Sequence, residues 1–393
     1  MNCEVCGSES IEPVLDLGNQ PLCDDLVSLD STRVCRFYPI QISLCLSCGT
    51  ALQNFQVDRT TLFPSEYHYR AKRTPSVLQS MQDLVLKTMS YISSTISDPI
   101  VLDIGCNDGA LLDFFNSSGC RTFGIDPTNA ASEAALNHHV LQDYFDTSSS
   151  QRLLELIGRK PDVITFTNCF AHINNFSELS NALKVLLDQD TILVIENHYL
   201  GSVLASNQFD TFYHEHPRTY SFRSFSSIAS TLDLKIFDCV LTSRYGGNIQ
   251  VFMSRNANST TCFVTEPVDH LLGQFRAMSS YIPNWKKTKL EAINSAVSSH
   301  GPLKGIGFPG RASILINLLG LDSDALSATF EIAGSIKTGY YIPGTRIPIL
   351  PESELFDLPD FPDLILNLAW HIEEDVIRNL YSYGRKPSLL SLM

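Results

Sequence analysis

Four short apolar segments between residues 99 and 197 constrain the fold of this 393-residue chain more than any other feature. The segments are PIVLDIGC, RTFGIDP, DVITFTN and TILVIEN, and each is rich in β-branched residues, as buried parallel strands are. Stretches that read as helices, such as ALLDFFNSSG and FSELSNALKVLL, lie between them. This alternation predicts a doubly wound α/β sheet of the Rossmann-like kind, with its ligand site at the carboxyl ends of the strands.

Two further regions flank the predicted sheet. Residues 1–70 hold six of the eleven cysteines and several turn signals, with little helical periodicity. After the polar stretch SRNANSTT, a strand, a Gly-rich turn and a helix recur in LKGIGFPGRASILINLLG, and PDLILNLAWHIEEDVIRNL is a second strand–helix pair. We therefore predict domains at residues 1–70, 71–255 and 256–393, the last being a second, smaller α/β domain.

The amino-terminal region contains two CxxC pairs, each followed by glycine: Cys3 with Cys6, and Cys45 with Cys48. Two such turns can aim four thiolates at one tetrahedral zinc ion, and four protein ligands leave no open position for catalysis. The alternative is a redox CxxC, which needs only one pair and a nearby βαβ unit. We predict a structural zinc site. Cys23 and Cys35 fall outside the pattern and are expected to be buried apolar residues.

VLDIGCNDG places Asp103, Gly105 and Gly109 between a predicted strand and a predicted helix. Glycines there let a ligand approach the backbone closely, and Asp126 at the end of the next strand can accept both ribose hydroxyls. The pattern Asp-x-Gly-x-x-x-Gly is the loop found in S-adenosylmethionine (SAM)-dependent methyltransferases. NAD is the main alternative cofactor, and the absence of a G-x-G-x-x-G loop argues against it.

The densest group of ionisable side chains lies in FDTFYHEHPRTYSF, after the fourth predicted strand, and includes Tyr213, His214, Glu215 and His216. A histidine titrates near neutrality, a neighbouring carboxylate can orient it, and tyrosine hydroxyls can donate to a developing oxyanion. His172, just after a predicted strand end, is a second candidate for the same site. A two-imidazole metal site at His214 and His216 and a purely structural polar loop are the alternatives.

The net charge of the chain limits the classes of partner that it can bind. Lys and Arg total 28 against 42 Asp and Glu, a formal net charge of −14, which disfavours broad binding of nucleic acid or anionic membranes. No apolar run is long enough to span a bilayer. The first residues carry neither the charged region nor the apolar core of a secretory signal, so we expect a cytoplasmic enzyme with a small-molecule substrate.

Over nearly the whole chain, the order of motifs resembles the C-methyltransferases that act on nucleotide-linked 4-keto-deoxysugars. The resemblance is carried by LDLGNQPL, both cysteine pairs, YHY, VLDIGCNDGALL, GIDPTNA, NCFAHINN, FDTFYHEH and GYYIPGTRIPI. It implies a zinc-binding amino-terminal module, a central SAM domain and a carboxyl-terminal domain that helps to hold the nucleotide sugar. It also implies a reaction of deoxysugar biosynthesis in which the carbon beside a ketone loses a proton and the enolate takes the methyl group.

The resemblance implies roles for individual residues. The catalytic set is Tyr213, Glu215, His216 and His172, together with Tyr67 or Tyr69. We expect His216 to be the base and Glu215 to orient it, although the roles of the two histidines could be exchanged. The expected cofactor-binding residues are Asp103, Gly105, Asn107, Gly109, Asp126 and Asn168, and the expected substrate-binding residues are Arg311, Lys337, Tyr245 and Asn248.

The chain departs from that family where substrate contacts are expected. Relatives usually read THGGSLR where this chain has RYGGNIQ at 244–250, and GAPxKG where it has GFPGRA at 307–312. The family's acidic residue five positions before Lys337 is Ile332 here, and its Trp-Asn becomes Trp370-His371. The reaction class is therefore better supported than the substrate. An O- or N-methyltransferase, an NAD-dependent oxidoreductase and a non-catalytic zinc-bearing module are the alternatives, and the sugar, nucleotide, methylated carbon and oligomeric state stay open.

Overall fold

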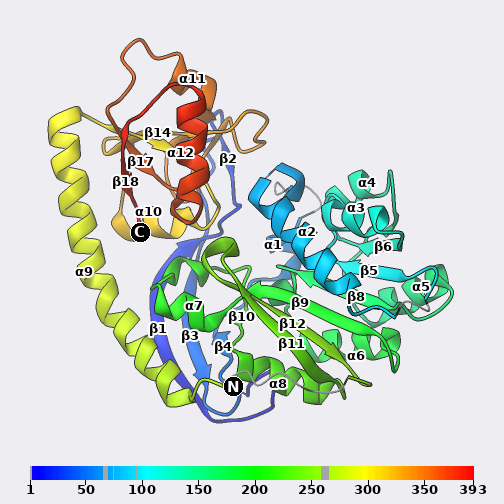
Figure 1. Cartoon of the computed structure of the whole chain (residues 1–393). Coiled ribbons are helices and arrows are strands. Elements are labelled where there is room, and N and C mark those ends of the chain that lie inside the picture. The colour runs from blue at the N-terminus through cyan, green and yellow to red at the C-terminus, as the bar shows by residue number, and fades with distance from the viewer. Residues whose placement is uncertain (1, 65–69, 74, 94–95, 258–264) are drawn as a thin grey trace. The chain divides into compact units, whose positions relative to one another are not determined.

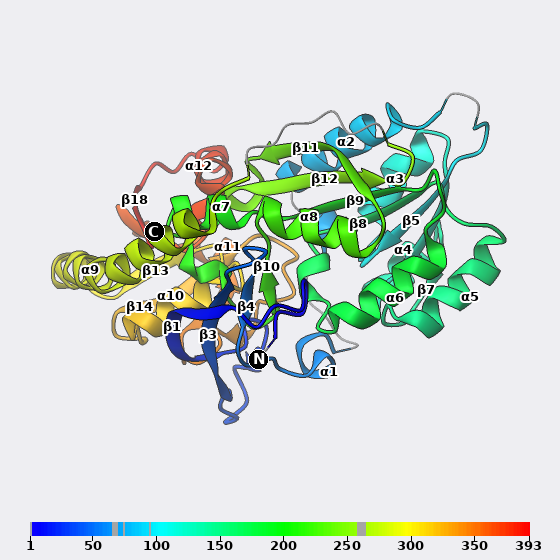
Figure 2. The ribbon, with the colours of Figure 1, turned by 90° about the horizontal axis from the view of Figure 1, so that it is seen from below.

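The computed structural model describes residues 2–64, 70–73, 75–93, 96–257 and 265–393. Its contacts divide the chain into two units. Unit 1 comprises residues 1–13, 43–206 and 215–272, and unit 2 comprises residues 14–42, 207–214 and 273–393. Each unit contains its own seven-stranded sheet (Figures 1 and 2).

The sheet of unit 1 has the strand order β11-β12-β9-β8-β5-β6-β7. Its strands are β5 (Ile100–Ile104), β6 (Arg121–Ile125), β7 (His139–Leu141), β8 (Val163–Thr167), β9 (Ile192–His198), β11 (Lys235–Thr242) and β12 (Asn248–Ser254). Strands β5 to β9 run parallel, whereas β12 runs antiparallel to both β9 and β11. The predicted doubly wound α/β fold is confirmed, and the four predicted strands are β5, β6, β8 and β9.

Helices cover both faces of this sheet (Figure 1). They are α2 (Pro75–Met89), α3 (Ala110–Ser117), α4 (Ala130–Ala134), α5 (Thr147–Ile157), α6 (Phe176–Leu186) and α8 (Phe222–Thr231), whereas the short helix α7 (Leu200–Ala205) follows β9. Alternate residues of each strand point to opposite faces, so Leu193 and Ile195 join the core with α6 and α8, and Val194 joins the core with α2 and α3. Burial on both faces explains why these strands are nearly continuous apolar runs.

The strand order places a topological switch point between β5 and β8. From β5 the chain proceeds outward through β6 and β7, and from β8 it proceeds through β9 in the other direction. In such sheets, the crevice for ligands opens beyond the carboxyl ends of the strands at the switch. The loops after β5, β8 and β9 therefore form the candidate site.

The sheet of unit 2 has the order β18-β17-β13-β14-β16-β15-β2. Its strands are β2 (Val27–Ser28), β13 (Leu303–Ile306), β14 (Leu326–Glu331), β15 (Tyr340–Tyr341), β16 (Pro348–Pro351), β17 (Leu364–Asn367) and β18 (Ser388–Ser391), with helices α10 (Ala312–Leu319), α11 (Glu352–Phe356) and α12 (Glu373–Ser382). Strand β13 pairs in parallel with both β14 and β17, so the switch point of this sheet lies between β13 and β17.

A third, four-stranded sheet has the order β1-β3-β4-β10, with β1 (Ile11–Pro21), β3 (Phe37–Cys45), β4 (Ala51–Gln53) and β10 (Arg218–Thr219). The described residues also form helices α1 (Arg59–Leu62) and α9 (Val268–His300) and several 3-10 helices, among them η2 (Phe170–His172), η3 (Phe209–Thr211) and η4 (Arg244–Gly246). Within the described ranges, no helix combines the length and apolarity needed to cross a bilayer.

Candidate active site and metal centre

The four predicted metal ligands converge. The Sγ atoms of Cys3, Cys6, Cys45 and Cys48 all lie within 4.8 Å of one another. Two of the Sγ–Sγ separations, Cys3 to Cys48 and Cys6 to Cys45, are 3.6 Å. Thiolates at 2.3 Å from a tetrahedral zinc ion are about 3.8 Å apart, so the donor set fits zinc.

The two knuckles fold alike, which explains the glycine after each pair. The amide of Gly7 donates to the carbonyl of Cys3, and that of Gly49 donates to the carbonyl of Cys45, at 2.8 and 2.9 Å. Both glycines have positive φ, +75° and +67°, a conformation that disfavours a side chain. Hydrogen bonding to the sulfur of Cys45 raises the pKa of the Cys3 thiol to about 12, and a bound cation would reverse that effect.

The metal-binding module is hydrogen-bonded to the His216 segment within unit 1. Strand β4 begins three residues after Cys48 and pairs with β10, which begins two residues after His216. Gln53 donates from its backbone amide to the carbonyl of Pro217 at 2.9 Å and from Nε2 to that of His216 at 3.1 Å. Fully buried Arg218 pairs with Glu4 and donates to the carbonyl of Ile173, the residue after His172.

The loop after β5 has the backbone that a closely bound ligand requires. Gly105, Asn107 and Gly109 all have positive φ. A Cβ added to Gly105 would lie 2.7 Å from the Cβ of Cys169, and one added to Gly109 would lie 3.0 Å from that of Ala134. The loop therefore excludes side chains at both glycines.

Two buried carboxyl groups flank this loop. Thr165 donates from Oγ1 to Asp103 at 2.7 Å, yet burial dominates and raises the pKa of Asp103 to about 7. Asp126 accepts from the amide of Asn107 at 3.0 Å and from the hydroxyl of Thr128 at 2.6 Å. Burial also raises the pKa of Asp126. Oδ1 of Asp126 accepts from both the amide and the hydroxyl of Thr128, whereas Oδ2 accepts from Asn107 alone and retains acceptor capacity for a ribose hydroxyl.

Asn168 follows β8 at the switch point with φ +56°. Its Oδ1 accepts from Nδ2 of Asn248 at 2.9 Å, whereas its Nδ2 has no hydrogen-bond partner among the described residues. Asn248 also donates to the fully buried carboxylate of Glu196 at 2.9 Å. Glu196 accepts from Gln250 as well, at 3.0 Å, and lies 3.2 Å from Nη1 of Arg244. Asn248, predicted to bind substrate, is thus part of a buried polar network around Glu196.

A row of rings runs through unit 1 beside this network. His172 stacks on His216 with centroids 5.1 Å apart, and His216 lies 5.2 Å from His198 at the end of β9. Phe63 stacks on His172 at 5.1 Å, and Tyr245 lies 5.7 Å from His198. The structure therefore brings together His172 and His216, which are 44 positions apart, and adds His198, which was not singled out from the sequence. Its only local signal is its position at a predicted strand end.

Burial lowers the pKa of His172 well below its usual value, and the neighbouring His216 lowers it further. His172 is therefore a neutral imidazole near pH 7 and a weak base. Glu215 and His216 are both buried, and Tyr213 is partly exposed. Tyr67 and Tyr69, also predicted to be catalytic, lie outside the described residues.

His214 and His216 have different surroundings. His214 is buried, its Nε2 lies 3.1 Å from the carbonyl oxygen of Tyr38, and burial lowers its pKa to about 4. His216 instead contacts His172 and His198. Among the described residues, the four cysteines are the one group of three or more side chains placed to share a metal ion.

In unit 2, Arg311 follows β13 at the switch point but is largely occupied by neighbours. Its Nε lies 3.2 Å from the carboxylate of Asp210, and its Nη1 donates to Thr211 at 3.2 Å. The guanidinium also stacks over the ring of Trp370 at 4.7 Å, and Trp370 donates from Nε1 to Asp210 at 3.0 Å. Nε and Nη2 of Arg311 are both buried donors with no hydrogen-bond partner inside the described ranges. Because Nε is the atom beside Asp210, Nη2 is the donor that remains for a ligand.

Lys337 has an acidic neighbour that the motif comparison did not identify. The expected acidic position is Ile332, which is exposed, but the preceding residue, Glu331, ends β14. Burial raises the pKa of Glu331, and Lys337 opposes that effect. The Nζ of Lys337 donates to the carbonyl of Phe308 at 3.1 Å, and the amide of Phe308 donates to Glu331.

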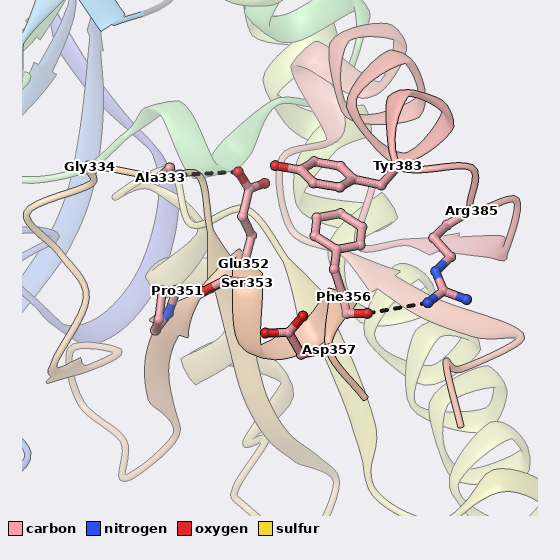
Figure 3. A pocket seen from close by; sticks show the side chains of 9 residues that line it. All are labelled: Ala333, Gly334, Pro351, Glu352, Ser353, Phe356, Asp357, Tyr383 and Arg385. Atoms are coloured by element: carbon pink, nitrogen blue, oxygen red, sulfur yellow. Dashed lines mark hydrogen bonds between the residues drawn. The ribbon is translucent and has the colours of Figure 1, made fainter. Parts of the chain in front are cut away.

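Unit 2 also contains a pocket of about 520 Å³ (Figure 3). It is lined by Ala333, Gly334, Pro351, Glu352, Ser353, Phe356, Asp357, Tyr383 and Arg385. The rings of Phe356 and Tyr383 stack with centroids 3.8 Å apart, and the amide of Ala333 donates to Glu352 at 3.1 Å. None of the residues predicted for the active site lines this pocket.

Three protein-family models match successive parts of the chain. Residues 3–63 match a model whose description names a zinc binding domain. Residues 69–238 match a methyltransferase domain, and residues 243–388 match a C-methyltransferase C-terminal domain.

Among curated proteins, the chain is 27% identical to the C-methyltransferase NovU of Streptomyces niveus, over 96% of this chain and 91% of that protein. Among solved structures, it is similar to an S-adenosylmethionine-dependent methyltransferase from Clostridium acetobutylicum, with a TM-score of 0.36 and 14% identity over 45% of this chain and 91% of that one. The plantazolicin methyltransferase BpumL is similar at a TM-score of 0.36 and 14% identity, over 47% of this chain and 87% of its own.

Proposed function

Because the chain is a SAM-dependent methyltransferase with a C-methyltransferase C-terminal domain and a zinc-binding module, we propose that it methylates a carbon beside a ketone on a nucleotide-linked 4-keto-deoxysugar. The observation that supports this most is the row of imidazoles in the same unit as the glycine loop. Methyl transfer to carbon needs a base, whereas transfer to an amine or a hydroxyl can use a lone pair of the acceptor.

The residues around the switch point of unit 1 fit SAM. The turn through Gly105 and Gly109, both at positive φ, precedes a helix as a nucleotide-type loop does, and the carboxylate of Asp126 suits the ribose hydroxyls. Nδ2 of Asn168, which has no hydrogen-bond partner among the described residues, suits an acceptor on the ligand. When bound, SAM supplies an electrophilic methyl group on a sulfonium.

The chain's own task is to make the substrate carbon nucleophilic. We assign proton removal to His216, with Glu215 orienting its ring, because the lowered pKa of His172 makes that residue the weaker base. A neutral His172 is suited to donate an N–H to the enolate oxygen together with the hydroxyl of Tyr213. Each of these groups, once positioned, contributes on the order of 10²–10⁴ in rate.

For the substrate, the proposal rests on the order of motifs described under the sequence analysis and on the basic side chains of unit 2, whereas the similarity to NovU supports carbon as the methyl acceptor. Lys337 and the remaining donor of Arg311 are the candidates for a diphosphate. A small-molecule methyltransferase acting on oxygen or nitrogen is the alternative.

The test is mass spectrometry of the pure protein with a panel of nucleotide 4-keto-deoxysugars in deuterated water, with and without SAM. Deuterium uptake beside the ketone and a methyl gain that requires SAM are expected, and both should fall at least 100-fold in His216→Asn. His139→Asn, at an exposed histidine outside the ring row, is the matched control and should keep full activity. A methyl group on oxygen or nitrogen, or an unchanged His216→Asn, would refute the proposal.

A further inference from the structure

His198 is the last residue of β9 and lies at the carboxyl edge of the sheet of unit 1. Its backbone is fixed on both sides: it lies opposite Asn248 in the antiparallel ladder with β12, and the next amide, that of Tyr199, donates to the carbonyl of Gly247 at 3.1 Å. A side chain placed by a strand end is held more rigidly than one on a free loop.

The ring of His216 contacts both the ring of His172 and the ring of His198, with centroids 5.1 and 5.2 Å away. His172 is nearly parallel to His216, at an interplanar angle of 25°, whereas His198 is tilted by 59°. His216 therefore contacts two imidazoles that come from different strand ends, one after β8 and one at the end of β9. This packing restricts the orientation of the His216 ring.

Three imidazoles this close cannot all be protonated, because like charges at about 5 Å repel strongly in a partly buried site. His216 and His172 face each other, and His198 faces His216 and Tyr245. Arg244 lies over the ring of Tyr245 at 4.9 Å, but its charge is paired with buried Glu196. His172 is already kept neutral by burial, so within this row of rings protonation of His216 competes with protonation of His198.

We propose that His198 is a positioning residue for the methyl-transfer reaction: it fixes the ring of His216 against His172 and limits how readily that ring holds a proton. The inference rests on the proposed function of His216 as the base. After removing a proton from the substrate carbon, His216 must release it again, and a neighbouring imidazole that competes for positive charge favours that release.

The test compares the wild type with His198→Gln, which keeps a polar side chain but removes the titrating ring. The pKa of His216 is measured without substrate, by NMR titration of the protein with ¹³C-labelled histidine, and His216→Asn assigns the signal. We expect the midpoint of His216 to rise by about half a unit or more in His198→Gln. The pH profile of deuterium exchange into the substrate should shift in the same direction, with exchange at pH 7 slower by up to about threefold for each half unit of that shift.

His139→Gln is the matched control and should leave the His216 midpoint unchanged, because His139 lies on β7 and stacks on Phe123, outside the ring row. SAM affinity confirms that each variant is folded, and His198→Asn replaces His198→Gln if that variant does not bind SAM. An unchanged His216 midpoint in the folded variant would overturn the inference. If the midpoint shifts but no substrate exchanges deuterium, the positioning role stands and the proposed reaction fails.

Discussion

Replacing Asp103 by Asn should remove a specific pH dependence from the stability of unit 1. Asp103 lies in the inner strand β5, where burial raises the pKa of its carboxyl group to about 7. In the unfolded chain, the same group has its ordinary pKa near 4. Asn has nearly the same shape and keeps an oxygen that can accept the hydrogen bond from Thr165.

The sign and the size of this change in the free energy of unfolding follow from the difference in proton binding between the folded and the unfolded chain. Between about pH 4 and pH 7 the folded protein holds a proton on Asp103 that the unfolded chain releases, so the free energy of unfolding falls as the pH rises. Above pH 7 the contribution of Asp103 is constant. Each pH unit between about 4 and 7 changes the free energy of unfolding by about 1.4 kcal/mol. Raising the pH from 5.5 to 8.5 should therefore lower the free energy of unfolding of the wild type by about 2 kcal/mol more than that of Asp103→Asn.

The assay is amide hydrogen exchange followed by mass spectrometry at pH 5.5, 7 and 8.5, in the absence of SAM. Peptides covering β5 and β8 report the free energy of opening of the sheet around Asp103. A lower limit of pH 5.5 is chosen to limit protonation of the zinc thiolates. Asp98→Asn is the control, because the side chain of Asp98 is 56% exposed just before the same strand.

A difference in opening free energy between the wild type and Asp103→Asn that does not change with pH would contradict this prediction. If Asp103→Asn and the wild type differ by the same free energy at pH 5.5 and pH 8.5, to within about 0.5 kcal/mol, then Asp103 does not titrate in this window. A change of the same size in Asp98→Asn would show that the effect arises from net charge rather than from burial.

Three other substitutions have clear expected outcomes. Gly105→Ala should weaken SAM binding at least tenfold by calorimetry because of the crowded Cβ, whereas Gly119→Ala, also at positive φ but with open space around it, should not. Cys45→Ser should lower the zinc content measured by elemental analysis and speed amide exchange in β10. Arg311→Gln should destabilise unit 2 by about 3 kcal/mol in urea, followed by the fluorescence of the two tryptophans, because it leaves buried Asp210 without its cation.

Matched controls exist for the last two substitutions. Cys120→Ser removes a buried thiol outside the metal cluster and should leave the zinc content unchanged. Arg378→Gln removes an arginine that is 73% exposed and paired with Asp375, and it should change the stability of unit 2 by less than about 0.5 kcal/mol. Equal destabilisation by Arg311→Gln and Arg378→Gln would contradict the inference that Arg311 stabilises unit 2 by pairing with buried Asp210.

The parallel strands and the cysteine cluster could be predicted because their signals are local. Short β-branched runs bounded by turn residues identified β5, β6, β8 and β9, and two identical turns identified the thiolate pairs. The antiparallel hairpin of β11 and β12 was not predicted, although its connection, RYGG, carries turn glycines.

Contacts between distant segments could not be predicted in the same way. His198 joins His216 only because the end of β9 lies beside the His216 segment, and nothing in either local sequence encodes that proximity. Glu331 shows a second reason. The motif comparison looked for a carboxylate at Ile332, but β14 ends one residue earlier and places Glu331 near Lys337 instead. A motif with fixed spacing does not match an equivalent residue that is displaced by one position.

The pairing of β4 with β10 has a consequence for anyone who recombines such enzymes. A chimera that exchanges only the first 70 residues for those of a relative would place a foreign Gln53 equivalent against the native backbone of His216 and Pro217, and a foreign Glu4 equivalent against native Arg218. The unit that can be transplanted intact is discontinuous: it comprises the cysteine module together with residues 215–221. Crossover points chosen at the apparent domain boundary would divide it, whereas a graft of both segments would carry its own hydrogen-bonding partners.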